Sequence, residues 1–187
     1  MSAPAAGRLR RASTAGMDVG VAFREAMSLL ASTVVMVTTR VDGRPWGLTI
    51  SACCSVSGTP PMILVSLGAQ TVSARAIRDG GVFGVSVLGR EQVEAARAGA
   101  AAGAPKFVER FCRAEEVGRA GDEARRTPAV AGAVAHLDCG VERTVDVADH
   151  TVFFAHVRDV VLSPGVAPLV YWARQYTELD RGEPWYH

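Results

Sequence analysis

A run of small polar residues constrains the fold of this chain more than any other feature of its sequence. The run extends from Gly47 to Ser57, carries no charge, and lies between the apolar runs 34–39 and 62–67. Where an ordinary buried strand has valine, isoleucine or phenylalanine, much of this one is threonine, serine, alanine and cysteine. An unpaired buried polar group costs about 1–3 kcal/mol, so the hydroxyl groups of such a strand need partners. We therefore predict that it faces a planar ligand rich in hydrogen-bond donors and acceptors.

Length and charge limit the classes of protein to consider. The chain has 187 residues, enough for one domain with a sizeable core, which we place at residues 18–187. Residues 1–17 are rich in Arg, Ser and Ala without an acidic residue, and we expect a disordered tail. The net charge of +1 gives no support for a nucleic-acid partner. No apolar run approaches the roughly 20 residues of a membrane span, so we expect a cytoplasmic protein with no membrane partner.

The cysteines do not form a recognisable disulfide framework or metal site. Cys53 and Cys54 are adjacent, while Cys112 and Cys139 are isolated, and no CxxC pair occurs. This pattern is typical of buried, reduced thiols in a cytosolic protein, and we expect no metal. A nucleophilic role for Cys54 needs a base or a helix N-terminus beside it, and its sequence neighbours offer neither.

Helical periodicity is confined to a few segments. Asp18 is a good N-cap residue, and after it Phe23, Met27 and Leu30 recur on one helical face. The other expected non-strand segments are a short helix from Thr71 to Gly80-Gly81, a weak helix at 90–112, and a surface loop at 113–128.

Most of the chain instead shows the pattern of β-strands. Asp42-Gly43 is a hairpin signal, and no regular alternation of strands and helices occurs. We therefore predict a mainly β fold with helices, an antiparallel barrel with helical decoration. The expected strands are 33–40, 47–57, 62–67, 82–88, 134–147, 151–162 and 169–172.

Several common sites are excluded by their missing motifs, and the histidines are the next candidates. The sequence has no GxxxxGK[ST], GxSxG or HExxH, and no GxGxxG after the first strand. His150 follows Asp149 at a turn before a strand, where an imidazole could contact a ligand at a barrel rim. The alternative is a solvated turn histidine bonded to Asp149 or to the backbone. His136 is expected to be structural or to face solvent, and His156 and His187 are assigned no role.

Taken together, a series of short motifs resembles the flavin reductase-like family, the short-chain NAD(P)H:flavin reductases of two-component monooxygenases. The resemblance covers about residues 18 to 179, and it is carried by the order and spacing of the motifs. They are Phe23 to Met27, Gly47 to Ala52, Ser55 to Ser57 with Pro60-Pro61, Phe83 to Leu88, Lys106-Phe107, Leu137 to Cys139, Asp149 to Thr151, Pro168 to Tyr171, and Tyr176.

The resemblance implies an antiparallel, flavin-binding split barrel that forms a homodimer with its site near the subunit interface. Proteins of this type reduce free FAD or FMN with NADH or NADPH, by hydride transfer directly from nicotinamide to flavin. The reduced flavin then diffuses to a separate monooxygenase. FAD is the flavin that the resemblance favours, while the choice between NADH and NADPH stays open.

The resemblance also implies roles for individual residues. His150 would be the catalytic residue that contacts the nicotinamide or the region of hydride transfer, and Phe107 would flank the flavin. Ser86 and Ala148 depart from many relatives, which have Asn and Gly at these places. The residues implied to bind the cofactor are Thr33, Val34, Thr49, Ile50, Ser51, Ala52, Cys53, Cys54, Ser66, Leu67, Ser73, Ala74, Phe107, His150 and Tyr171.

Two alternatives differ from this function in class. One is a flavin- or haem-binding split-barrel protein without reductase activity. The other is a flavoprotein that keeps its flavin and reduces another acceptor.

Overall fold

The computed structural model describes residues 18–103, 106–107, 114–117 and 126–179. The predicted tail at 1–17 lies outside the described residues, as do Cys112 and the last residues, 180–187, of the predicted domain. Within the described residues, the helices are α1 (Val19–Ser28), α2 (Val72–Gly80), α3 (Val93–Ala100) and the short 3₁₀ helix η1 (Arg90–Gln92). The strands are β1 (Ser32–Thr33), β2 (Val35–Val41), β3 (Arg44–Ile50), β4 (Cys53–Gly58), β5 (Pro61–Gly68), β6 (Val82–Val87), β7 (Ala114–Val117), β8 (Thr127–Val130), β9 (Ala135–Val147), β10 (His150–Leu162), β11 (Leu169–Trp172) and β12 (Gln175–Glu178).

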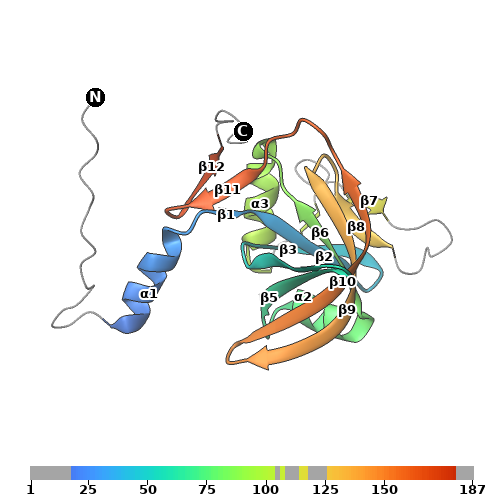
Figure 1. Cartoon of the computed structure of the whole chain (residues 1–187), viewed down its shortest axis with the longest axis horizontal. Helices are drawn as coiled ribbons and strands as arrows, with labels where there is room; N and C mark the ends of the chain where they lie inside the picture. The colour runs from blue at the N-terminus through green and yellow to red at the C-terminus, as the bar shows by residue number, and fades with distance from the viewer. Residues whose placement is uncertain (1–17, 104–105, 108–113, 118–125, 180–187) are drawn as a thin grey trace.

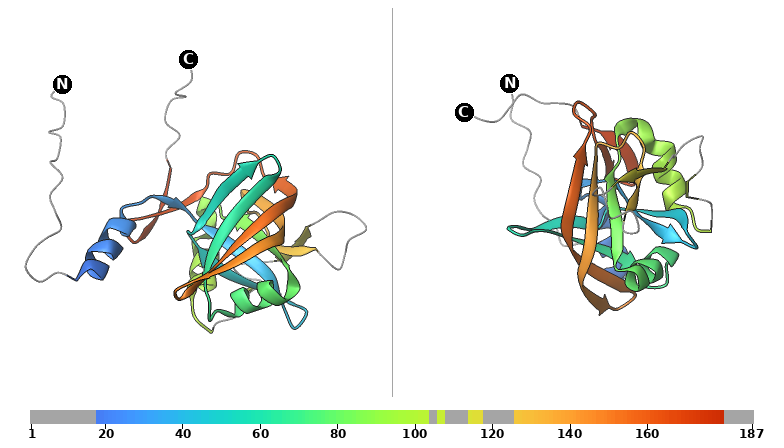
Figure 2. Two further views of the ribbon diagram at one scale, coloured as in Figure 1. Left: turned by 60° about the horizontal axis from the view of Figure 1, so that its bottom comes forward. Right: turned by 90° about the vertical axis from the view of Figure 1, so that its right-hand side faces the viewer.

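The main sheet has seven antiparallel strands in the order β3-β2-β6-β9-β10-β5-β4. Its edge strands, β3 and β4, are consecutive in the chain, so the sheet curls until its two edges approach each other (Figures 1 and 2). The prediction of one strand over 47–57 is therefore wrong. The run bends at Ser51 and Ala52, and its halves pair with β2 on one edge and with β5 on the other. Ala52 still joins the ladder, since its carbonyl accepts from Ser66 N–H at 3.0 Å.

A small sheet of β1, β11 and β12 lies beside the main sheet and leads to α1, which extends away from the body (Figure 1). Asp18 caps α1 as predicted, accepting from the amide groups of its first turn. The apolar face predicted for this helix is not buried within the chain, because Phe23, Met27 and Leu30 are 61%, 47% and 58% exposed. None of the helices described here has the length and apolar character that crossing a bilayer requires.

Residues 90–130 differ from the sequence-based prediction in two places. The helix predicted over 90–112 is shorter, since α3 ends at Ala100. The loop predicted over 113–128 contains strand β7, which pairs with β8. The residues of β7, Ala-Glu-Glu-Val, do not alternate between apolar and polar, so no period of two marks this strand.

The hydrophobic core has two parts on opposite faces of β2. Val35 and Val37 point into the curled sheet, while Val34 and Met36 point to the face that α3 covers. Burial on both faces stabilises the fold by about 1.5–3 kcal/mol for each large apolar side chain. The inner cluster is Val35, Val37, Ile63, Val65, Leu67, Ala74, Ile77, Phe83, Val85, Cys139, Phe153 and Ala155, and the outer cluster is Val34, Met36, Leu88, Ala95, Ala96, Val130, Ala133 and Leu169.

Helix α2 shows how local interactions set the two ends of a helix. Thr71 caps its N-terminus by accepting from Ala74 N–H at 3.2 Å, and Gly81 ends it with φ +67°. Only glycine adopts that left-handed conformation readily, so both predicted ends are confirmed. Ile77 packs in the inner cluster, whereas Val72, the first residue of the helix, is 41% exposed.

Candidate functional site

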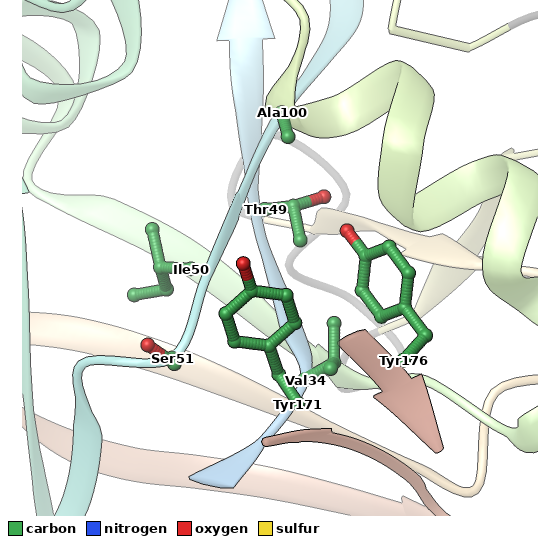
Figure 3. A pocket seen from close by; sticks show the side chains of 7 residues that line it. All are labelled: Val34, Thr49, Ile50, Ser51, Ala100, Tyr171 and Tyr176. Atoms are coloured by element: carbon green, nitrogen blue, oxygen red, sulfur yellow. The ribbon is translucent and has the colours of Figure 1, made fainter. Parts of the chain in front are cut away.

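A pocket of about 230 Å³ opens where the small sheet meets β3 and α3 (Figure 3). Figure 3 shows the hydroxyl oxygens of Tyr171 and Tyr176 directed toward the Thr49 side of this pocket. Its lining combines apolar side chains with four hydroxyl groups. The residues are Val34, Thr49, Ile50, Ser51, Ala100, Tyr171 and Tyr176, and we call this the first pocket.

The β11–β12 hairpin supplies the two tyrosines as a cross-strand pair. Tyr171 lies opposite Tyr176 in the ladder, with ring centroids 5.4 Å apart and an edge-to-face angle of 61°. Tyr171 also pairs with Ser32 of β1, which fixes the hairpin beside Val34. Burial raises the pKa of the Tyr176 phenol, so this hydroxyl group is a neutral hydrogen-bonding group at neutral pH.

The opposite wall depends on a close approach of α3 to β3 at Gly99. A Cβ on Gly99 would overlap the hydroxyl oxygen of Thr49 and would lie 2.8 Å from Met36 Cε. Only glycine permits this contact, which places Ala100 at the mouth of the pocket. The buried Oγ1 of Thr49 has no hydrogen-bond partner among the described residues. A buried hydroxyl without a partner in the protein is a position where a ligand could supply one.

A second pocket, of about 360 Å³, lies on the other side of Ala100. Its lining includes the start of α2, where Ser73 is 1% exposed and its Oγ has no partner among the described residues. The N-terminus of a helix favours an anionic group, because its first amide groups point outward. This second pocket is lined by Trp46, Leu48, Gln70, Thr71, Val72, Ser73, Ala100, Ala101, Ala102, Gly103 and Lys106.

The structure brings together many, but not all, of the residues expected to bind a cofactor. Ser73 lines the second pocket, and Ala74 beside it is buried in the inner cluster. Leu67 is also a core side chain, 1% exposed, so it faces the protein interior. Five of the expected residues line the first pocket, namely Val34, Thr49, Ile50, Ser51 and Tyr171.

The remaining expected residues lie around these pockets without lining them. Thr33 is exposed on β1, and Ala52 is exposed at the bend between β3 and β4. Ser66 is half-buried on β5, opposite Val152 of β10. Phe107 is half-buried and packs against the outer cluster beneath α3.

Cys53 and Cys139 have the properties of unreactive thiols. Burial, followed by the nearby Cys54, raises the pKa of Cys53 to about 11, and burial also raises the pKa of Cys139. Thiols with raised pKa values are poor nucleophiles at neutral pH. Cys54 is exposed, which corrects the expectation that it is buried. Within the described residues, no group of three or more His, Cys, Asp or Glu side chains could hold a metal ion.

His150 lies at the β9–β10 hairpin and lines neither pocket. Its Nδ1 is 2.8 Å from Asp149 Oδ1, the contact expected of a turn histidine, and this contact lowers the pKa of the Asp149 carboxyl. The hairpin does approach the second pocket, because His150 pairs with Gly68 and Asp149 O accepts from Ala69 N–H, just before α2. Ala148 has φ +51°, a left-handed conformation that favours glycine, the residue that the resemblance predicted at this place.

His136 is buried, 3% exposed, so of the two expected roles, structural or facing solvent, it has the structural one. Its Nδ1 lies 2.9 Å from Ser86 Oγ and its Nε2 lies 3.1 Å from Thr127 Oγ1. Thr127 donates its hydroxyl hydrogen to Asp138 at 2.9 Å, so it accepts from His136 Nε2–H. Strand β8 covers this face of β9, and burial lowers the pKa of His136 to about 4.

Comparison with known proteins decides the family. Residues 27–180 match the family described as the flavin reductase like domain. The chain belongs to this family. Its fold agrees with the family, as the chain superposes on the NADH:FAD oxidoreductase SgcE6 of Streptomyces globisporus C-1027, which was solved with NAD and FAD fragments. The TM-score is 0.77 at 28% identity, over 88% of this chain and 95% of that chain. The predicted family and the mainly antiparallel β fold of the split-barrel type are therefore confirmed.

Two curated members of the flavin reductase like family are similar along most of their length. The chain is 35% identical over 156 residues to the FMN reductase (NADH) RutF of Ancylobacter novellus, with 82% of each chain covered. It is 34% identical over 154 residues to the reductase component of 4-nitrophenol 4-monooxygenase/4-nitrocatechol 2-monooxygenase of Rhodococcus opacus. That match covers 82% of this chain and 78% of the relative.

Sequence reasoning missed several residues that line the pockets. Tyr176 belonged to a family motif, but it was assigned no contact. Its position opposite Tyr171 across a short turn was a usable signal, since two strands of four residues suffice for such a pair. Ala100 lies in an Ala- and Gly-rich helix whose small side chains show no pattern. Trp46, Leu48 and Lys106 were likewise assigned no contact with a ligand.

Proposed function

We propose that this protein is an NAD(P)H:flavin reductase that reduces free flavin and releases it to a separate monooxygenase. The observation that carries the proposal is a pair of adjoining pockets with Ala100 as their common wall. Each pocket has a hydroxyl group without a partner among the described residues, Thr49 in one and Ser73 in the other.

The residues present fit a flavin nucleotide. The first pocket combines the apolar side chains of Val34 and Ile50 with phenol and alcohol groups, which suits a flat ring with polar edges. The second pocket places Ser73 and the N-terminus of α2 beside the same wall, which suits a phosphate group. When bound, the flavin accepts a hydride from the nicotinamide and supplies the redox chemistry.

The protein has a positioning task rather than a proton-transfer task. Among the described residues, the lining of the first pocket carries no charged side chain, and the half-buried phenol of Tyr176 stays neutral because its pKa is raised. Such a lining holds a ring in place and excludes water from its surroundings. We assign the fifteen residues named above to the cofactor site, with Leu67 and Ala74 acting through their main chain. His150 is assigned to the nicotinamide, because its hairpin adjoins the start of α2.

The choice of cofactors follows from similarity. The relative from Ancylobacter novellus is an FMN reductase that uses NADH, and SgcE6 is an NADH:FAD oxidoreductase. We therefore propose NADH as the hydride donor, with FAD as the first flavin to test and FMN as the second.

The proposed partners are an oxygenase and a second copy of this chain. The Rhodococcus opacus relative is the reductase component of a monooxygenase, which supports transfer of reduced flavin to a separate oxygenase. The α1 helix and the two residues after it present an exposed apolar surface, which we assign to a homodimer interface. Its residues are Val19, Phe23, Met27, Leu29 and Leu30. The proposal includes a cytoplasmic location and a folded domain at residues 18–187.

Nicotinamide oxidation by the purified protein tests the function. The assay follows NADH or NADPH consumption with FAD, with FMN and without added flavin. Turnover that rises with free flavin supports the proposal. Flavin binding without NADH or NADPH oxidation would establish the binding-only alternative, and turnover by yellow protein without added flavin would establish a flavoprotein with a retained cofactor.

A further inference from the structure

The C-terminal end of α3 forms the wall between the two pockets, and it is held in an unusual way. Many helices end with a glycine in the left-handed conformation, whose amide groups satisfy the last carbonyl groups. Here the C-cap residue is Ala101, with extended backbone at φ −67° and ψ 128°. Its N–H donates to Arg97 O at 3.0 Å, so other donors are needed for the carbonyl groups that follow.

Lys106 supplies those donors. Its ammonium group lies 3.4 Å from the carbonyl oxygen of Ala98, 3.2 Å from that of Gly99, and in close contact with that of Ala101. A cation at this end of a helix also interacts favourably with the helix dipole. The side chain is 4% exposed and its Nζ lies 5.7 Å from the centroid of the Trp46 ring.

Apart from Lys106, this end of α3 meets the sheet through residues with small side chains or none. The helix has eight residues, fewer than an isolated helix needs for stability. Its contact with Thr49 is made by Gly99, which has no side chain to interlock with β3. Ala100, which lines both pockets, contributes only a methyl group. The position of this wall therefore depends on the hydrogen bonds of the carbonyl groups on either side of it.

We infer that Lys106 is a positioning residue for the flavin site, which holds Gly99 and Ala100 against Thr49 through the carbonyl groups of α3. Burial lowers the pKa of the Lys106 ammonium, a cost that its three carbonyl partners and the Trp46 ring offset. Since Lys106 is the only lysine of the chain, no other ammonium group can replace it. This inference rests on the proposed function, because it names what shapes the proposed flavin site.

Lys106→Met tests the inference, because it keeps an unbranched apolar side chain and removes the charge and all three donors. The dissociation constant for FAD should rise on the order of tenfold, as expected for the loss of charge-assisted hydrogen bonds. At saturating flavin, kcat should stay within about twofold, because the reacting atoms are not touched. Lys106→Arg, which keeps charge and donors, should restore most of the affinity.

Arg97→Met is the matched control. It removes a cation from the last turn of the same helix, but the Arg97 side chain is 63% exposed and pairs with Glu94 at 2.7 Å. Its affinity for FAD should equal that of the wild-type protein. If Lys106→Met does not fold, as judged by circular dichroism, Lys106→Gln carries the same expectation with a smaller increase.

Hydrogen exchange separates this inference from the proposed function. Without flavin, the Ala101 amide should exchange faster in Lys106→Met than in Arg97→Met, since the end of α3 is released. Unchanged exchange at Ala101, or wild-type affinity for FAD in Lys106→Met, would overturn the positioning role while leaving the reductase proposal intact. A wild-type protein that neither binds nor reduces flavin would overturn both proposals.

Discussion

Thr49 and Gly99 lie so close together that any side chain at residue 99 would overlap the Thr49 hydroxyl oxygen. This contact joins α3 to the edge of the main sheet and closes one side of the first pocket. It leaves Thr49 Oγ1 buried and without a hydrogen-bond partner among the described residues. In the proposed function, that hydroxyl group is paired when the flavin binds.

Thr49→Val therefore separates a ligand-binding hydroxyl from an ordinary buried one. Valine has nearly the same shape, so the loss of one hydrogen bond should weaken FAD binding about three- to tenfold. Thr38→Val is the matched control, because Thr38 is fully buried, its Oγ1 also lacks a partner in the described structure, and it lines neither pocket. That control should keep its FAD affinity and gain about 1 kcal/mol in free energy of unfolding.

If both variants bind FAD like the wild-type protein, Thr49 does not contact the flavin. Fluorescence titration and chemical denaturation provide the two measurements.

His150→Ala should lower kcat/KM for NADH about tenfold and leave the dissociation constant for FAD unchanged, since His150 is assigned to the nicotinamide. His156→Ala is the control, because His156 lies on the same strand with its Nε2 3.3 Å from Glu142 Oε2. Steady-state kinetics with varied NADH measure the effect. Wild-type kinetics in the His150 variant would show that His150 is a turn histidine whose role is its hydrogen bond to Asp149, without a contact to the nicotinamide.

The buried His136 makes a prediction about pH and stability. Its pKa is about 4 in the folded protein, below the ordinary value of 6.5, so the unfolded chain takes up a proton first as the pH falls. Stability is therefore present above pH 6.5 and is lost between about pH 6.5 and pH 4, by about 3 kcal/mol.

Denaturant unfolding at a series of pH values measures this loss. His136→Gln should remove that part of the pH dependence, while His156→Gln, at a partly exposed position, should retain it. An equally steep loss in the His136 variant would assign the acid sensitivity to other groups.

The apolar surface of α1 predicts the assembly. Phe23→Ser combined with Met27→Ser should convert a dimer into a monomer in sedimentation velocity, because both side chains are exposed in the single chain. Val161→Ser, at an exposed apolar position on β10, should leave the dimer intact. A wild-type protein that sediments as a monomer would contradict the proposed interface.

Hairpins and helix caps were the part of the fold that the sequence revealed most directly. Asp42 and Gly43 form the turn between β2 and β3, and both have positive φ, as the Asp-Gly signal predicts. Such positions are set by one or two residues, so local sequence is enough to identify them. The caps of α2 at Thr71 and Gly81 are of the same kind.

Structural features that depend on contacts with distant segments could not be predicted from the sequence. The break at Ser51 and Ala52 lies inside a uniform run of small residues, and it becomes apparent only when β4 pairs with β5. His136 and Asp138 alternate with apolar residues as outward residues do, yet both are buried and contact Thr127 of β8. A strand pattern predicts the two faces of a strand, but it does not predict what packs on each face.

The candidate site was predicted in part, and the reason differs between residues. Five of the residues that the resemblance assigned to the cofactor line the first pocket. Ala100 and Lys106 were missed because their contribution depends on where a short, weakly patterned helix ends. Family motifs identify side chains that are large or chemically distinctive. They do not identify a residue such as Ala100, whose methyl group matters only because of where it lies.

The bend between β3 and β4 also has a bearing on aggregation. Edge strands present unpaired amide and carbonyl groups that another chain can add to, and proteins restrain such edges with proline, bulges and bends. Pro45 removes a donor from β3, and a bulge between Ser55 and Ser57 distorts β4. Both edges belong to one short stretch of the chain, which turns from one to the other at Ser51 and Ala52. The small residues proposed to approach the flavin would thus also help to prevent the growth of the sheet from one molecule into the next.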